Sequence, residues 1–300
     1  MSEPKLNYLP CADNGTGHRM AYWQWGPADA AHVVLCVHGL SRQGRDFDVL
    51  ARTVVERAGG AVQVICPDVV GRGKSDWLGE PSGYQVPNYA ADMFALLAHL
   101  KPTAQVLDWV GTSMGGLIGM AVFGQTQFPS PVPLRRLVLN DVGPAIEWES
   151  IVRIGQYLGR VVQFGSLQQA ADAMWAVSTT FGPHTPAQWL ELSRHMVKPV
   201  PGSPSAVTLH YDPAIAEPFG AMTQESAAQG EALLWQLYDA IAAQTLLLRG
   251  AQSDLLSPQT ARLMTERGPK ARLVEFEGVG HAPTLVANDQ VDSVTQFLLA

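Results

Sequence analysis

The sequence predicts an α/β fold in which helices cover both faces of a mostly parallel sheet. Short apolar, β-prone runs alternate along the chain with segments whose apolar residues repeat at helical spacing. Some runs are apolar throughout, such as 32–37, which is typical of strands buried on both faces. The chain has 300 residues, of which 47% are hydrophobic, so a large core is available.

The first part of the chain contains six expected strands, each a short apolar or β-prone run. They are 5–8, 19–25, 32–37, 62–66, 106–110 and 134–139. Helices are expected where apolar residues recur every three or four positions. These are 47–55, 88–100 and the segment from 117 to 123. Because strands and helices alternate, the sheet should be largely parallel.

The segment 145–224 interrupts this alternation. It is mostly helical in pattern, contains no convincing strand and is rich in aromatic residues. Such an apolar segment is not expected to stay disordered. We therefore predict an inserted helical cap after the sixth strand, with a core formed by 1–144 and 225–300.

The last part of the chain returns to alternating elements. Two further strands are expected at 245–248 and 271–276. Three helices are expected at 226–241, 258–267 and 290–299. Pro258 suits the first turn of its helix, where a missing amide hydrogen costs nothing.

Charge and composition exclude several classes of partner. The net charge is −7 and the Lys and Arg residues are scattered, which argues against binding to nucleic acid or an anionic membrane. No apolar run is long enough to span a bilayer, and the N-terminus lacks signal-peptide features. The three cysteines suggest no disulfide framework. We expect a cytoplasmic monomer or homodimer that binds a small molecule.

The most informative stretch surrounds Ser113. A β-prone run is followed by Gly111-Thr112-Ser113-Met114-Gly115 and then by a helical pattern. Glycines two positions on either side of the serine suit a turn too tight for a Cβ atom. Such a turn would project the Ser113 hydroxyl from the edge of the sheet, although the serine could instead simply cap the helix.

Polar residues gather after the predicted strands, where ligands of an open parallel sheet bind. They are His38-Gly39-Leu40, Asp68, Ser113, Asn140-Asp141, Asp254 and His281. A serine nucleophile needs a base, and His281 follows the last strand. The base in turn needs a carboxylate. Asp254 follows the strand before the one that leads to His281, so the chain order is Ser, Asp, His, and we favour it as the acid. Asp141 is the alternative acid.

The developing oxyanion of an acyl transfer would also need hydrogen-bond donors. The amide of Met114 at the start of the helix is one, and the amide of Leu40 is the natural second. We interpret His38 as structural. The segment 67–75 lacks the spacing of a phosphate-binding P-loop. No His, Cys or carboxylate pair has convincing metal-ligand spacing, so we expect neither a metal nor a cofactor.

With these motifs in order, the chain resembles the α/β-hydrolase superfamily, in the serine-nucleophile branch with a helical cap. The matching motifs are VHGL (37–40), PDVVGRGKSDW (67–77), GTSMGG (111–116), LVLNDVGP (137–144), LLLRGAQSDLL (246–256) and GVGHAP (278–283). The resemblance implies a catalytic triad of Ser113, Asp254 and His281, with Leu40 and Met114 in the oxyanion hole. It argues against epoxide hydrolases and haloalkane dehalogenases, which use an aspartate nucleophile.

The leading hypothesis is a carboxylesterase-like serine hydrolase that cleaves small to medium apolar esters through an acyl-enzyme. A lactonase, or a hydrolase of C–C bonds in vinylogous ketoacids, would use the same triad and is the alternative. A ligand-binding module without turnover is a third hypothesis, from a different functional class.

Overall fold

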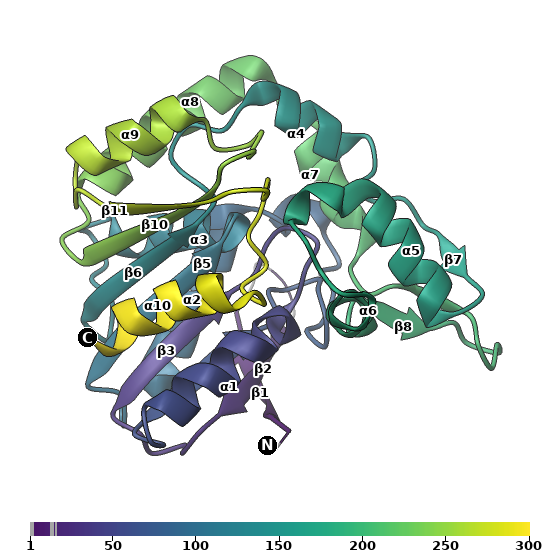
Figure 1. Cartoon of the computed structure of the whole chain (residues 1–300), viewed down its shortest axis with the longest axis horizontal. Helices are drawn as coiled ribbons and strands as arrows, with labels where there is room; N and C mark the ends of the chain where they lie inside the picture. Colours follow the sequence, from purple (N-terminus) through teal and green to yellow (C-terminus); the bar gives the residue numbers. More distant parts are fainter. Residues whose placement is uncertain (1–2, 13–14, 16) are drawn as a thin grey trace.

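The computed structural model describes residues 3–12, 15 and 17–300. Its main feature is an eight-stranded sheet in the order β1-β2-β4-β3-β5-β6-β10-β11 (Figure 1). The strands are β1 (Lys5–Cys11), β2 (His18–Trp25), β3 (His32–Val37), β4 (Val62–Pro67), β5 (Val106–Thr112), β6 (Leu134–Asn140), β10 (Gln244–Gly250) and β11 (Arg272–Phe276). β2 pairs antiparallel with β1 and β4, and the other pairs are parallel. The predicted α/β fold with a mostly parallel sheet is confirmed.

Both faces of the sheet are buried, as the continuous apolar strands predicted. Along β3, the residues at 33, 35 and 37 enter one core, while those at 34 and 36 enter the core on the opposite face. This division follows from the two-residue period of a strand. Each buried face must therefore be covered by helices.

Helices pack on each side of the sheet (Figure 1). On one face, α1 (Asp48–Arg57) lies against α10 (Asn288–Leu299). The other core contains residues of α2 (Val86–Leu100), α3 (Met114–Phe123), α8 (Gln224–Asp239) and α9 (Pro258–Glu266). Among the described residues, no helix is both long enough and apolar enough to cross a membrane.

Between β6 and α8, the chain leaves the sheet and forms a separate group of short elements, seen on the right of Figure 1. Its helices are α4 (Trp148–Gly155), α5 (Leu167–Ser178), α6 (Pro186–Arg194) and α7 (Ala216–Gly220). Its strands β7 (Gln163–Phe164), β8 (Val197–Pro199) and β9 (Val207–Leu209) form a small antiparallel sheet. The expectation of no strand here was wrong, because strands of two or three residues are too short to show periodicity.

The inserted segment is attached to the loop after β4 by main-chain hydrogen bonds. The amide of Asp212 donates to the carbonyl of Gly71 over 2.7 Å, and the amide of Gly73 donates to the carbonyl of His210 over 3.0 Å. The Tyr84 hydroxyl also donates to the Asp212 carboxylate. These contacts hold one side of the insertion against the loop that follows the carboxyl end of β4. The boundaries 145–224 for a cap domain stay a prediction.

Two glycine substitutions, one at the turn between β5 and α3 and one in α8, should change stability in opposite directions. In Gly115→Ala the new Cβ would overlap the carbonyl oxygen of Val37, a main-chain atom that cannot rotate away. We expect a loss of about 3 kcal/mol or more in the free energy of unfolding. In Gly230→Ala, inside α8, the new Cβ meets nothing within 4 Å, and we expect a gain of about 0.5–1 kcal/mol.

Urea denaturation followed by circular dichroism measures both changes. Similar stability of Gly115→Ala and the unsubstituted protein would contradict the close approach of α3 to β3.

Candidate active site

Ser113 lies at the turn between the end of β5 and the start of α3. Its backbone has φ 51° and ψ −116°, a conformation that residues with a side chain rarely adopt. The turn is tight because Cβ atoms at either flanking glycine, 111 or 115, would collide with the main chain. The Ser113 side chain makes no capping hydrogen bond to α3. The hydroxyl is therefore available at the sheet edge, and the helix-cap alternative is not observed.

The structure brings His281 to Ser113, although 168 positions separate them in the chain. His281 follows β11, and its Nε2 lies 3.0 Å from the Ser113 Oγ. Its Nδ1 lies 2.7 Å from the Asp141 Oδ2. Because a carboxylate only accepts, this contact favours the hydrogen on Nδ1 and leaves Nε2 free to accept from the serine hydroxyl.

Asp141, which directly follows β6, is the acid that contacts His281. Its side chain is fully buried, and Oδ1 accepts a hydrogen bond of 2.9 Å from the amide of Gly250. The Ser253 hydroxyl donates to Oδ2 over 2.6 Å. These donors stabilise a buried negative charge and fix the carboxylate toward the imidazole. The positive φ of 55° at Asp141 is a conformation that Asp tolerates better than most residues.

The expectation that Asp254 orients His281 is wrong. The Asp254 carboxylate instead pairs with Arg153 over 2.6 Å, and half of its side chain is exposed. In the loop after β10, Ser253 is the residue that turns toward Asp141. Both aspartates follow strands at the same sheet edge, so position along the chain could not distinguish them. The direction in which each loop turns decided between them.

Leu40 and Met114 present unused main-chain donors beside the serine. Gly39 approaches closely, since a Cβ there would lie 3.7 Å from the Ser113 Cβ. Within the described part of the chain, the amides of Leu40 and Met114 have no hydrogen-bond acceptor. The Met114 amide is also at the first residue of α3, where the helix dipole favours negative charge. Both are free to bind an oxyanion.

His38 is structural in its contacts, as predicted. Its Nδ1 donates to the carbonyl of Gly39 over 2.7 Å, and its Nε2 accepts from the amide of Val69 over 2.9 Å. Complete burial lowers the pKa of His38 to about 3, so the ring is neutral. Both ring nitrogens are occupied in holding the loop that carries Leu40.

The segment 67–75 is a shaped loop held by buried side chains. The Asp68 carboxylate accepts from the amides of Gly44 over 2.7 Å and Lys74 over 2.8 Å. The Ser75 hydroxyl donates to the Asp68 carbonyl over 2.5 Å. Burial raises the pKa of Asp68 to about 6 despite these donors. The segment is therefore structural and does not form a phosphate site.

Sequence reasoning missed the roles of Arg72 and Asn140. The buried Arg72 donates from Nε to the Leu40 carbonyl over 2.8 Å, which fixes the peptide beside Ser113. The Asn140 amide donates to the Thr112 hydroxyl and to the Pro283 carbonyl, at 3.0 and 2.8 Å. Asn140 thus ties β5 to the loop of His281. The only signal in the sequence was their position in loops or at strand ends.

A cavity of about 370 Å³ opens over Ser113 and His281. Much of its wall comes from the inserted segment and is apolar. These apolar residues include Ile154, Leu158, Val162, Phe164, Met174 and Phe181. The cavity is therefore suited to a small ligand with substantial apolar surface.

Three arginines also line the cavity, a feature that sequence reasoning did not identify. Arg42 forms a two-point ion pair with Asp46, and Arg153 pairs with Asp254. Among the described residues, Arg160 has no carboxylate within 4 Å, and its side chain is exposed at the wall. The cavity therefore offers one cation that is free to bind an anionic group.

Comparison with known proteins agrees with this architecture. The sequence pattern described as the alpha/beta hydrolase family matches residues 34–294. This chain belongs to that family. It is 44% identical to a 3-hydroxybutyrate-oligomer hydrolase of Cupriavidus necator over 297 residues, which cover 99% of this chain and 98% of the relative.

Solved structures of other proteins have the same fold. An alpha/beta hydrolase from Novosphingobium aromaticivorans superposes with a TM-score of 0.82 at 34% identity, with 99% of each chain covered. An esterase from Mycobacterium tuberculosis superposes with a TM-score of 0.69 at 20% identity, covering 100% of this chain and 92% of the other. The second likeness shows the fold alone.

Changing each of the two aspartates to asparagine should affect the reactivity of Ser113 very differently. Asp141→Asn keeps the shape and the tolerated backbone conformation but removes the charge that fixes the His281 tautomer. We expect a fluorophosphonate to label Ser113 about 10³-fold more slowly. Asp254→Asn removes a half-exposed ion pair, and the labelling rate should stay within about threefold. Equal effects of the two substitutions would contradict the assignment of Asp141.

Proposed function

We propose that this chain is a serine hydrolase that cleaves carboxylic esters through an acyl-enzyme intermediate. The proposal rests on the continuous hydrogen-bonded series from Ser113 through His281 to Asp141 at the base of the cavity. In it Ser113 is the nucleophile, His281 is the general base and Asp141 replaces the expected Asp254 as the acid. Membership of the alpha/beta hydrolase family supports the proposal.

In the first half-reaction, the Ser113 Oγ attacks the carbonyl carbon of the ester while His281 Nε2 takes its proton. Asp141 stabilises the imidazolium that forms. The amides of Leu40 and Met114 donate to the oxyanion of the tetrahedral intermediate. The intermediate collapses when the C–O bond to the alcohol breaks and His281 returns the proton to the leaving oxygen. The acyl group is then esterified to Ser113.

In the second half-reaction, water enters where the alcohol has left. His281 takes a proton from this water as its oxygen attacks the acyl carbon. The same two amides bind the second oxyanion. Collapse breaks the bond to Ser113, and the imidazolium returns its proton to the serine oxygen. The products are an acid and an alcohol, and the enzyme is restored.

We further propose that the substrates are short esters of hydroxyacids that end in a free carboxylate. An oligomer of 3-hydroxybutyrate, on which the Cupriavidus necator relative is named to act, is a chain of this kind. Its methyl groups match the apolar cavity wall, and its terminal carboxylate matches Arg160.

The nucleophile is tested by Ser113→Ala. Removing the hydroxyl should lower turnover of a p-nitrophenyl ester and of a 3-hydroxybutyrate dimer by about 10³-fold or more, since no acyl-enzyme can form. Ser178→Ala, which alters another serine of the cavity wall, is the matched control and should retain turnover. Undiminished turnover in Ser113→Ala would contradict the mechanism.

The carboxylate preference is tested by Arg160→Gln. For a 3-hydroxybutyrate dimer, kcat/KM should fall about three- to tenfold, because one charge-assisted contact is lost. For the methyl ester of the same dimer, it should stay unchanged. Arg262→Gln removes an equal charge from an exposed position on α9 and is the control. An equal loss on both substrates would contradict the role of Arg160 while leaving the serine mechanism intact.

A further inference from the structure

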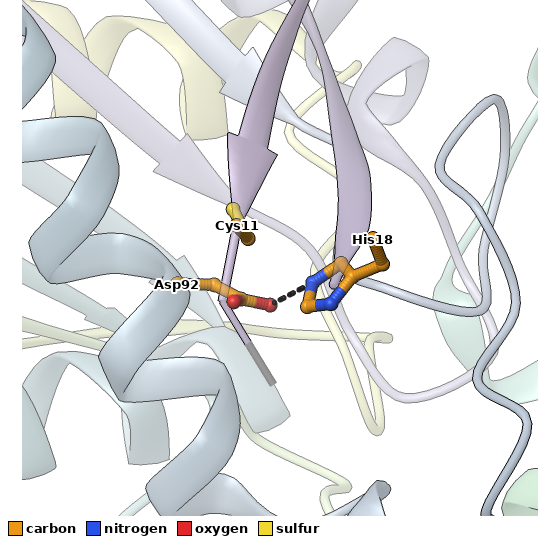
Figure 2. A group of neighbouring side chains, drawn as sticks. All are labelled: Cys11, His18 and Asp92. Atoms are coloured by element: carbon orange, nitrogen blue, oxygen red, sulfur yellow. Dashed lines mark hydrogen bonds and ion pairs between the residues drawn. The ribbon is translucent and has the colours of Figure 1, made fainter. Parts of the chain in front are cut away.

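A buried group of side chains lies at the opposite edge of the sheet from β11, outside the cavity. Figure 2 shows Cys11, His18 and Asp92 as neighbours that come from three different elements, with His18 and Asp92 directed at each other. Cys11 ends β1, His18 begins β2, and Asp92 lies in α2. All three residues are at most 9% exposed. None of them lines the cavity over Ser113 or takes part in the proposed reaction.

The convergence of these residues follows from the strand register and the packing of α2. Cys11 and His18 are directly opposite each other in the antiparallel pair of β1 and β2, so their side chains lie on the same face. Asp92 faces them from the helix that covers this face. Sequence spacing could not reveal the group, because its third member is 74 positions beyond His18.

The donor atoms are close to the spacing that a metal ion requires. His18 Nε2 lies 2.9 Å from the Asp92 Oδ2, and one donor atom from each of the three side chains lies within 4.8 Å of the others. Bonds of about 2.0–2.3 Å in a tetrahedral zinc site place ligand atoms roughly 3.3–3.8 Å apart. Shifts of about 1 Å in side-chain position would therefore admit an ion, without a change in the fold.

We propose that Cys11, His18 and Asp92 form a zinc-binding site in which a thiolate, an imidazole nitrogen and a carboxylate oxygen are three ligands and water is the fourth. Sulfur and imidazole ligands favour zinc over magnesium or calcium, which prefer oxygen. A dication is matched in charge by one carboxylate and one thiolate. Binding transfers the Cys11 thiol proton to solvent and forms the metal–sulfur bond.

A bound dication would stabilise the thiolate form of Cys11, because metal coordination favours the deprotonated sulfur. Zinc would join the edge strand β1 and its neighbour β2 to α2. The expected effect of zinc is on stability, because the proposed nucleophile follows β5, which is four places from β1 in the strand order.

The test begins with protein stripped of metal by a chelator and titrated with zinc against a chromogenic competitor. We expect one tightly bound zinc per chain and a higher Tm when zinc is present. In Cys11→Ala and Asp92→Asn, the affinity should fall at least about tenfold and the rise in Tm should be lost. Cys36→Ala is the matched control, because it removes a buried thiol from the opposite face of the sheet.

Two further measurements separate this site from others. Cobalt(II) in place of zinc should give a thiolate-to-metal charge-transfer band that disappears in Cys11→Ala. His281→Ala should still bind zinc, which excludes the Asp141–His281 pair as the binding site. Circular dichroism checks that each variant is folded, and Asp92→Asn keeps a side chain of the same shape if Cys11→Ala fails to fold.

The proposal would be overturned by no stoichiometric zinc binding, by equal affinity in Asp92→Asn and the unsubstituted protein, or by loss of binding in His281→Ala. A cobalt complex without the thiolate band would also overturn it. None of these outcomes bears on ester hydrolysis by Ser113, so the two proposals are tested separately.

Discussion

The hydrogen bonds that join Asp141, His281 and Ser113 require three loops to be held at one edge of the sheet. Each residue follows a different strand, and the two contacts measure 2.7 and 3.0 Å. Asn140 connects two of these loops, since its amide donates to the end of β5 and to the carbonyl of Pro283. Because the parallel strands end at the same edge, residues that follow three different strands can meet there.

Beneath the site, buried polar groups keep the loops rigid. His38 and Asp68 accept main-chain hydrogen bonds from neighbouring loops, and Arg72 donates to the Leu40 carbonyl. A buried charge or amide without a partner would cost several kcal/mol, so these contacts strongly favour one loop arrangement. Their effect is to place the Leu40 amide beside Ser113 before any ligand binds, which is the preorganisation that the proposed oxyanion hole requires.

The inserted segment has a different relation to the site. It provides most of the apolar wall and Arg160, which has no carboxylate partner among the described residues. Ser113, His281 and Asp141 all come from the sheet edge. The proposed chemistry and the proposed choice of ligand therefore depend on different parts of the chain. Beside the edge strand β1, antiparallel register brings Cys11 and His18 together, outside the cavity.

The sequence by itself determined the alternation of strands and helices and pointed to Ser113 as the candidate nucleophile. Both are encoded locally, in apolar periodicity and in the glycines at 111 and 115 that permit the tight turn. His281 could be selected because it follows the last strand. The acid was decided only by the tertiary structure, because Asp141 and Asp254 both follow strands. One loop turns its carboxylate into a buried set of donors, and the other turns its carboxylate toward solvent and Arg153. Such a difference depends on contacts between loops that are distant in the chain, which no local pattern records.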